Sequence, residues 1–322
     1  MPNAYITLDV TDVNNLPPGV TVDDVSPYGY VPTKASCFIF LFLFGFSTAT
    51  HVIQAMYFKL WFLLPTAVLC GVGELAGWTG RLMSSNNVLN HNGFLIQITS
   101  TIIAPTPLLA ANFIMLGRII GRLGEGYSRL SQQWYSRIFL TCDLVALVMQ
   151  GVGGGIASSA KTDSGSNLGS NIMLVGIIFQ LVGIIVYTTL AAEFLWHYAQ
   201  DMPFRRAYVY MHRSKTPRRL KIMLMGMSAM TILLFIRSIY RTAELADGWH
   251  GTIITTEWLF DVFDALMISS AMLTLNVIHP GFFLVPEENP VELSTYRMDP
   301  KASSASTDNM LEHSGHGSMV TV

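Results

Sequence analysis

The sequence predicts an all-α membrane protein, a polytopic bundle of seven transmembrane helices with its N-terminus outside and its C-terminus in the cytoplasm. Three observations predict this class. Of the 322 residues, 51% are hydrophobic and only 12% are charged, about half the charged share of an ordinary soluble domain. Seven apolar runs are long enough to cross a bilayer. The basic residues between these runs gather on alternate loops.

The seven apolar runs predict the seven helices. A bilayer core of about 30 Å needs about 20 helical residues. Inside lipid the backbone must satisfy its own hydrogen bonds, so runs of this length predict helices. Pro105 and Pro107 fall inside the third run and predict a kink there. The runs cover residues 36–57, 60–80, 94–117, 138–157, 172–196, 222–245 and 253–278.

The loop charges predict the orientation. Twelve basic residues lie on one side of the runs and three on the other, and the positive-inside rule places the richer side in the cytoplasm. The twelve are Lys59, Arg118, Arg122, Arg129, Arg137, Arg205, Arg206, Arg213, Lys215, Arg218, Arg219 and Lys221, and the three are Lys34, Arg81 and Lys161.

The chain divides into three predicted parts. Residues 1–35 form an extracellular N-terminal segment, residues 36–280 the membrane domain, and residues 281–322 a cytoplasmic tail. The tail is rich in Ser, Thr, Glu and His and has few apolar side chains, so we expect it to be disordered. Such a tail could recruit cytoplasmic partners.

Ionisable residues within the apolar runs are the candidate functional residues, because a charge inside a membrane costs several kcal/mol unless it is paired or hydrated. The sixth and seventh runs each hold three of them at i, i+4, i+7 spacing, which predicts one stripe on each helix. Consecutive helices joined by a short turn are neighbours, so we expect a buried ionic network between them in the outer half of the bundle. The two stripes are Arg237, Arg241 and Glu244, and Glu257, Asp261 and Asp264.

Further polar residues in the other runs extend this set. Glu74 lies in the second run and is a candidate third contributor to the network, and Arg81 ends the same helix outside. Asp143 and Gln150 are seven residues apart in the fourth run and therefore share one face. Because acids outnumber arginines here, some acids need a proton, water or a cationic ligand. Two interpretations stay open: the ions only hold the bundle together, or they line a cavity that binds a head group or relays protons.

Several function classes have no support in the sequence. The Walker A pattern, the HExxH pattern and the GxSxG pattern do not occur, so we expect neither a nucleotide-driven pump nor an enzyme. We predict no catalytic residue, no cofactor and no metal site. The net charge of −2 provides no basic field for nucleic acid.

Five motifs follow one another from the second run to the end of the seventh. They are Glu74 to Arg81 (ELAGWTGR), Asp143 with Gln150 to Gly154 (QGVGG), Arg237 to Glu244 (RSIYRTAE), Glu257 with Asp264, and His279 to Gly281 (HPG). As an ordered set they resemble the fungal RTA-like proteins, the lipid-translocating exporter family of seven-helix membrane proteins. Trp78 stands where that family often has Tyr.

The resemblance implies a membrane exporter or translocator of amphipathic lipids, such as sphingoid long-chain bases or toxic amphiphiles, linked to stress or drug resistance. Membrane lipids or amphipathic small molecules are then the partners, and the plasma membrane is the expected location. The buried charges would give a head group a polar path, since its transfer through hydrocarbon is costly. The alternative is a seven-helix receptor or membrane stress sensor, which shares this orientation. Against it, no DRY-like triplet ends the third helix and no NPxxY pattern ends the seventh.

Overall fold

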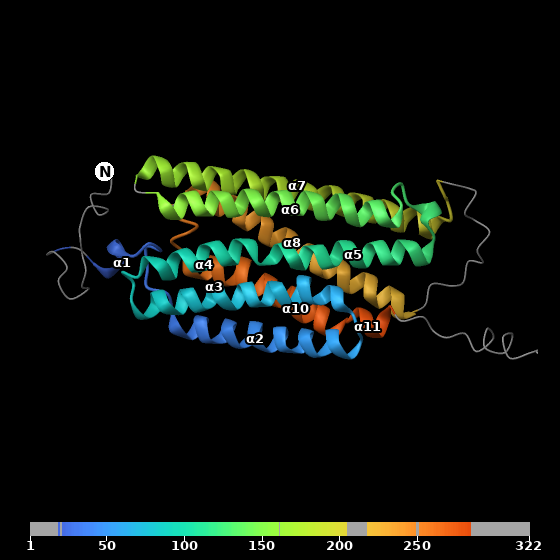
Figure 1. Cartoon of the computed structure of the whole chain (residues 1–322), viewed down its shortest axis with the longest axis horizontal. Coiled ribbons are helices and arrows are strands. Elements are labelled where there is room, and N and C mark those ends of the chain that lie inside the picture. The colour runs from blue at the N-terminus through green and yellow to red at the C-terminus, as the bar shows by residue number, and fades with distance from the viewer. Residues whose placement is uncertain (1–18, 20, 161, 205–217, 249–250, 285–322) are drawn as a thin grey trace, which may run out of the picture. The chain divides into compact units, whose positions relative to one another are not determined.

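The structure is a computed structural model that describes residue 19 and residues 21–160, 162–204, 218–248 and 251–284. The tail from 285 onward, most of residues 1–20 and four of the twelve basic residues predicted to be cytoplasmic (Arg205, Arg206, Arg213 and Lys215) lie outside the described residues. The chain up to Leu284 forms one compact unit. Every regular element in the described ranges is a helix (Figure 1), which confirms the predicted all-α class.

Seven stretches of the described chain are long and apolar enough to cross a membrane, and each overlaps one predicted run. Most extend beyond the apolar run, because adding a residue to an existing helix gains a backbone hydrogen bond at little cost. The spans are Lys34–Tyr57, Trp61–Asn86, Asn92–Leu123, Gln132–Ser159, Ser164–Gln200, Arg218–Asp247 and Glu257–Phe283.

Four of the spans are single helices, and the other three each join several helical elements. The single helices are α2 (Lys34–Tyr57) for the first span, α6 (Gln132–Ser159) for the fourth, α7 (Asp163–Gln200) for the fifth and α8 (Arg218–Asp247) for the sixth. The second joins η3 (Trp61–Leu63), η4 (Leu64–Val68) and α3 (Leu69–Asn86), and the third joins α4 (His91–Ile103) and α5 (Pro105–Leu123). The seventh joins α9 (Glu257–Phe260), η7 (Asp261–Leu266), α10 (Met267–Val277) and α11 (Pro280–Phe283). Short helices α1 (Val22–Val25) and η5 (Glu125–Tyr127) lie outside the spans.

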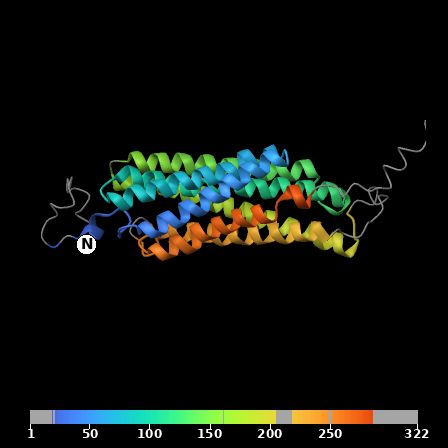
Figure 2. The same cartoon turned by 90° about the horizontal axis from the view of Figure 1, so that it is seen from below.

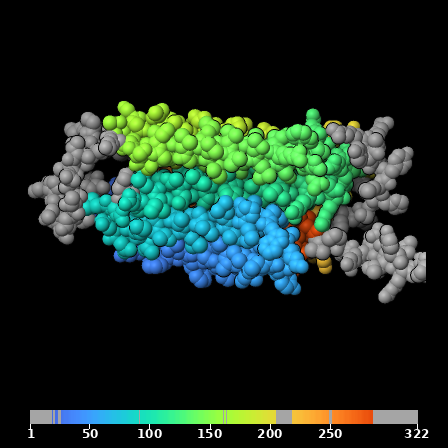
Figure 3. Space-filling model, in the orientation of Figure 1, coloured from blue at the N-terminus to red at the C-terminus, as the bar shows by residue number. Residues whose placement is uncertain are grey.

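The spans run side by side, with α6 packed along α7, α3 along α4, and α8 along α10 (Figures 1 and 2). Because successive spans reverse direction, their turns gather at two ends of the bundle. The Thr33 end holds Thr33, the turn at 87–90 and the turn at 251–256. The Lys59 end holds Lys59 and the loop at 124–131. Figure 3 shows the face on which α6 lies against α4 and α5.

Helix geometry is irregular within the second, third and seventh spans of the described chain. The third span is interrupted at Ala104, directly before Pro105, as the two prolines predict. Proline has no N–H and its ring clashes with the carbonyl four residues earlier. Segments η4 and η7 are π-helical, and π segments within α-helices often lie at functional sites.

Large apolar side chains cover the outside of the bundle. On α2, Phe38, Phe42 and Phe46 are 60%, 70% and 58% exposed, while Phe40 and Phe44 on the opposite face are buried. An apolar surface of this kind is rare on a soluble monomer. It fits helices that face lipid.

Helices α6 and α7 pack closely at two glycines, Gly153 and Gly169. A Cβ atom on Gly153 would lie 2.6 Å from the Met173 nitrogen and 2.7 Å from the Gly169 oxygen. These neighbours are backbone atoms, so they cannot move aside without shifting the helix. Small residues at such crossings let membrane helices pack backbone against backbone.

This crossing predicts a stability difference between two glycines of one helix. Gly153→Ala should destabilise the protein by about 1–3 kcal/mol through overpacking. Gly155→Ala should leave stability unchanged or raise it, because a Cβ there meets nothing within 4 Å and Ala favours helix. Thermal unfolding of the two purified variants in detergent measures the difference, and equal melting temperatures would contradict the crossing.

Candidate functional site

Two arginines on α8 share one carboxylate on the seventh span. Arg237 Nε and Arg241 Nε donate to Asp264 Oδ1 at 2.9 and 2.8 Å, and Arg241 Nη2 donates to Asp264 Oδ2 at 2.7 Å. All three side chains are buried. The ionic network expected between the sixth and seventh helices is therefore present, and Asp264 is its centre.

The same arginines also bind the third span at the point where proline interrupts it. Arg237 Nη2 donates to the Thr101 carbonyl oxygen at 2.6 Å, and Arg241 Nη2 donates to Thr101 Oγ1 at 2.8 Å. The usual donor to the Thr101 carbonyl would be the backbone N–H of residue 105, which is Pro105 and has none. Arg237 therefore satisfies a carbonyl that the proline leaves free.

Glu244 completes this group, which we name the arginine-pair cluster: Thr101, Arg237, Arg241, Glu244 and Asp264. Arg241 Nη1 donates to Glu244 Oε2 at 2.7 Å, and the Tyr240 hydroxyl donates to Glu244 Oε1 at 3.0 Å. The three guanidinium nitrogens of Arg241 are thus all engaged. Two arginines face two carboxylates, so the hydrogen-bonded cluster balances its charge.

Glu74 on α3 lies next to this balanced group. Its side chain is fully buried and within electrostatic range of Asp264, Arg237 and Arg241. Neither of its carboxylate oxygens accepts a hydrogen bond from the described residues. Glu74 therefore brings a third acid to two arginines that are already paired.

Arg81 gathers a second group at the Thr33 end, which we name the Arg81 cluster: Tyr28, Tyr30, Thr33, Arg81, Glu257 and Asp261. Arg81 Nη2 donates to the Tyr30 hydroxyl at 2.9 Å and to Glu257 Oε1 at 3.0 Å. Asp261 Oδ1 lies 4.0 Å from the same nitrogen. The backbone nitrogen and hydroxyl of Thr33 each donate to Glu257 at 2.7 Å. The segment before α2 is thereby bound to the seventh span.

Phe260 joins the two clusters. Its ring centroid lies 4.7 Å from Arg81 Cζ and 5.0 Å from Arg241 Cζ, within the range of cation–π attraction.

Tyr28 and Tyr30 lie outside the spans, and burial raises the pKa of Tyr28 to about 12. Burial also raises the pKa of Tyr30, although Arg81 opposes the shift. Both phenols are therefore neutral at physiological pH.

The predicted stripe of Glu257, Asp261 and Asp264 differs from the structure. Only Asp264 faces the arginines of α8, whereas Glu257 and Asp261 face Arg81 of α3. Residues 261–266 are π-helical, so this turn holds more residues than an α-turn. Spacing of four and three residues therefore does not place side chains on one face across it.

Asp143 and Gln150 belong to a third group that holds no arginine, which we name the amide cluster: Thr106, Asp143, Gln150 and Gln180. Gln180 Nε2 donates to Asp143 Oδ1 at 2.9 Å and to Thr106 Oγ1 at 3.1 Å. Gln150 Nε2 donates to Gln180 Oε1 at 3.1 Å. All four side chains are buried. The cluster links the third, fourth and fifth spans.

The sequence patterns do not single out Thr101, Thr106, Tyr30, Thr33 or Phe260. Threonine is common in membrane helices and often bonds within its own helix, so no spacing singles out Thr101 or Thr106. The signal that was available is Pro105, because a proline leaves the carbonyl of residue 101 without its donor. A buried arginine elsewhere in the bundle is a natural partner for that carbonyl.

Comparison with known proteins gives consistent matches. The model of the family described as RTA1 like protein matches residues 67–287. The chain is 30% identical over 300 residues to Sphingoid long-chain base transporter RSB1 of Saccharomyces cerevisiae (strain YJM789), covering 85% of this chain and 78% of the relative. Protein RTM1 of Saccharomyces cerevisiae is 31% identical over 60% of this chain and 59% of its own length.

A further relative is named for a different cargo. Protoporphyrin uptake protein 1 of Saccharomyces cerevisiae (strain ATCC 204508 / S288c) is 24% identical over 78% of this chain and 90% of its own length. No solved structure matches the chain.

The arginine-pair cluster predicts that two neighbouring aspartates differ in their effect on stability. Asp264→Asn should destabilise the protein by about 3–5 kcal/mol, because it leaves two buried guanidiniums without a charged partner. Asp261→Asn should cost far less, since that carboxylate is 18% exposed and 4.0 Å from Arg81. Thermal unfolding in detergent compares the two variants. A loss for Asp261→Asn as large as that for Asp264→Asn would contradict the assigned pairing.

Proposed function

This chain belongs to the RTA1-like family, and we propose that it is an integral membrane transporter for amphipathic lipids with a cationic head group, of the sphingoid long-chain base kind. The supporting observation is an excess of buried acid. Glu74 and one oxygen of Asp143 lie inside the bundle without hydrogen-bond donors. A carboxylate in that position needs a proton or a cation, and an amine head group supplies both charge and donors.

The arginines argue against an anionic cargo. Arg237 and Arg241 already bind Asp264, and Arg81 binds Glu257. A phosphate or carboxylate would have to displace these partners, and Glu74 beside them would repel it. Protoporphyrin carries carboxylates, so the acidic excess favours the cargo named for Sphingoid long-chain base transporter RSB1 over that named for Protoporphyrin uptake protein 1.

The proposal includes a direction and a place. With the basic loops in the cytoplasm, the Thr33 end faces outward and the Lys59 end inward. Export of a toxic amphiphile protects a cell only if the compound leaves across the plasma membrane. We therefore place the protein in the plasma membrane and link it to resistance against toxic amphiphiles. The chain works as a transporter and not as an enzyme.

The test is efflux of labelled long-chain base from cells that carry Glu74→Gln. This change keeps the size of the side chain and removes a carboxylate that accepts no hydrogen bond, so the fold should survive. Efflux should fall about tenfold, the effect of losing about 1.4 kcal/mol of head-group interaction. Glu193→Gln is the control, because that acid pairs with the exposed Arg129 and such pairs contribute little.

Wild-type efflux from Glu74→Gln cells, at equal protein level, would contradict the role of the buried acid. Removal of residues 287–322 separates the transporter from a receptor that signals through its tail. The transporter should retain both efflux and resistance without this segment. Lost resistance with intact efflux would favour the receptor.

A further inference from the structure

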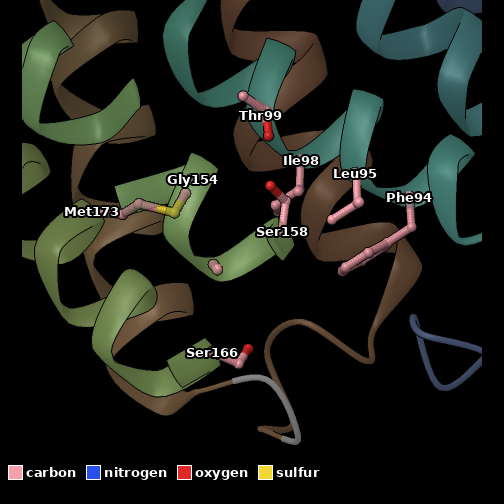
Figure 4. Close-up of a pocket in the computed structure, with 9 residues that line it drawn as sticks. Phe94, Leu95, Ile98, Thr99, Gly154, Ser158, Ser166 and Met173 are labelled. Carbon is pink, nitrogen blue, oxygen red and sulfur yellow. The ribbon is translucent and has the colours of Figure 1, made fainter. Parts of the chain in front are cut away.

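A pocket opens among α4, α6 and α7 near the Thr33 end (Figure 4). Its cavity volume is about 60 Å³, and the pocket is partly open at its mouth. Leu95 and Ile98 of α4 point into it opposite Ser158 of α6, and Met173 of α7 lies on the far side. The walls are mainly apolar, which suits a hydrocarbon chain.

Each of the three helices leads from this pocket to the amide cluster. On α6, Gln150 is one turn below Gly154, a distance of about 6 Å along the helix. On α7, Gln180 is seven residues beyond Met173, and in the third span Thr106 is seven beyond Thr99, each about 10 Å. Residues four or seven apart share a helix face, so the amide cluster lies deeper under the pocket-lining faces.

Packing between α6 and α7 supports the same alignment. A Cβ atom on Gly176 would lie 3.1 Å from Gln150 Cγ. Gly176 lies between Met173 and Gln180 on α7. Gln150 therefore rests on the part of α7 that joins the pocket to the cluster.

Two acceptor atoms of the amide cluster lack donors. Asp143 Oδ2 and Gln150 Oε1 are buried and accept no hydrogen bond from the described residues. Gln180 holds both side chains in place through its single amide. The ion pairs of the described chain join no Lys or Arg to Asp143, in contrast to Asp264. The cluster thus presents one carboxylate oxygen and one amide oxygen that need donors from outside the protein.

We propose that the pocket and the amide cluster together form the head-group site for a protonated long-chain amine that bears a neighbouring hydroxyl. The ammonium donates to Asp143 Oδ2 and the hydroxyl to Gln150 Oε1, while the alkyl chain lies along Leu95, Ile98 and Met173. This site deepens the proposed function and rests on it. It is separate from the arginine-pair cluster, and Glu74 is not part of it.

The test measures binding of radiolabelled sphingosine to the purified full-length chain in lipid nanodiscs. Asp143→Asn removes the charge and keeps an oxygen that can accept from Gln180. Gly154→Leu fills the pocket, where a Cβ lies in ordinary contact 3.6 Å from Thr99. Each variant should weaken binding about tenfold or more.

Gly155→Leu is the matched control, because it adds the same side chain to the next residue of α6, where a Cβ meets nothing within 4 Å. It should bind sphingosine as the wild type does. N-acetylsphingosine, which has no ammonium, should bind the wild type weakly and should bind Asp143→Asn no worse. If Asp143→Asn fails to fold, Gly154→Leu against Gly155→Leu still decides whether the pocket is used.

The outcomes separate this site from the proposed function. Wild-type binding in both Asp143→Asn and Gly154→Leu, with binding lost in Glu74→Gln, would overturn the site and leave the transporter standing. The same holds if the wild type shows no saturable sphingosine binding but cells still export the base. Absence of both binding and efflux would overturn the proposed function as well.

Discussion

The carboxylate of Asp264 binds two buried guanidiniums at once, and the packing of the third, sixth and seventh spans depends on that contact. Asp264 holds the seventh span against α8, and through Arg237 and Arg241 it reaches the third span at Thr101. The contact to Thr101 exists because Pro105 cannot donate to that carbonyl. Phe260 then connects the arginine pair with Arg81, which binds the segment before α2. One acid thus links the sixth and seventh spans directly and the third span through its two arginines, and the ring of Phe260 extends the connection to the Thr33 end.

This arrangement divides the buried polar residues by their role. In the arginine-pair cluster the charges balance and both guanidiniums bind Asp264, so its members act mainly in holding helices together. A buried ion pair of this kind is costly to break, even where its net contribution to stability is small. Glu74 and the amide cluster differ, because each keeps carboxylate oxygens without donors. We therefore propose that the two interpretations left open by the sequence apply to different residues: stability to Asp264 and its arginines, and cation binding to Glu74 and Asp143.

Much of the fold follows from the sequence, because the length of an apolar run and the self-satisfied backbone of a membrane helix leave few alternatives. The pairing of Arg237 and Arg241 with the seventh helix also follows, since isolated arginines in apolar runs need acids nearby. The division of Glu257 and Asp261 from Asp264 does not follow, because nothing in the composition of residues 261–266 marks a π-helical turn. Nor does the meeting of Asp143 with Gln180, which depends on how α6 and α7 align at their glycines.

Transport by the purified protein alone in liposomes tests most directly whether buried acids carry a cationic amphiphile across the membrane. The measurement is the rate at which sphingosine added to one leaflet reaches the other, compared with N-acetylsphingosine in the same vesicles. If buried acids carry the cation, the protein accelerates the movement of sphingosine and leaves that of the uncharged analogue near the rate of empty liposomes. Equal acceleration of both lipids, or of neither, would contradict it.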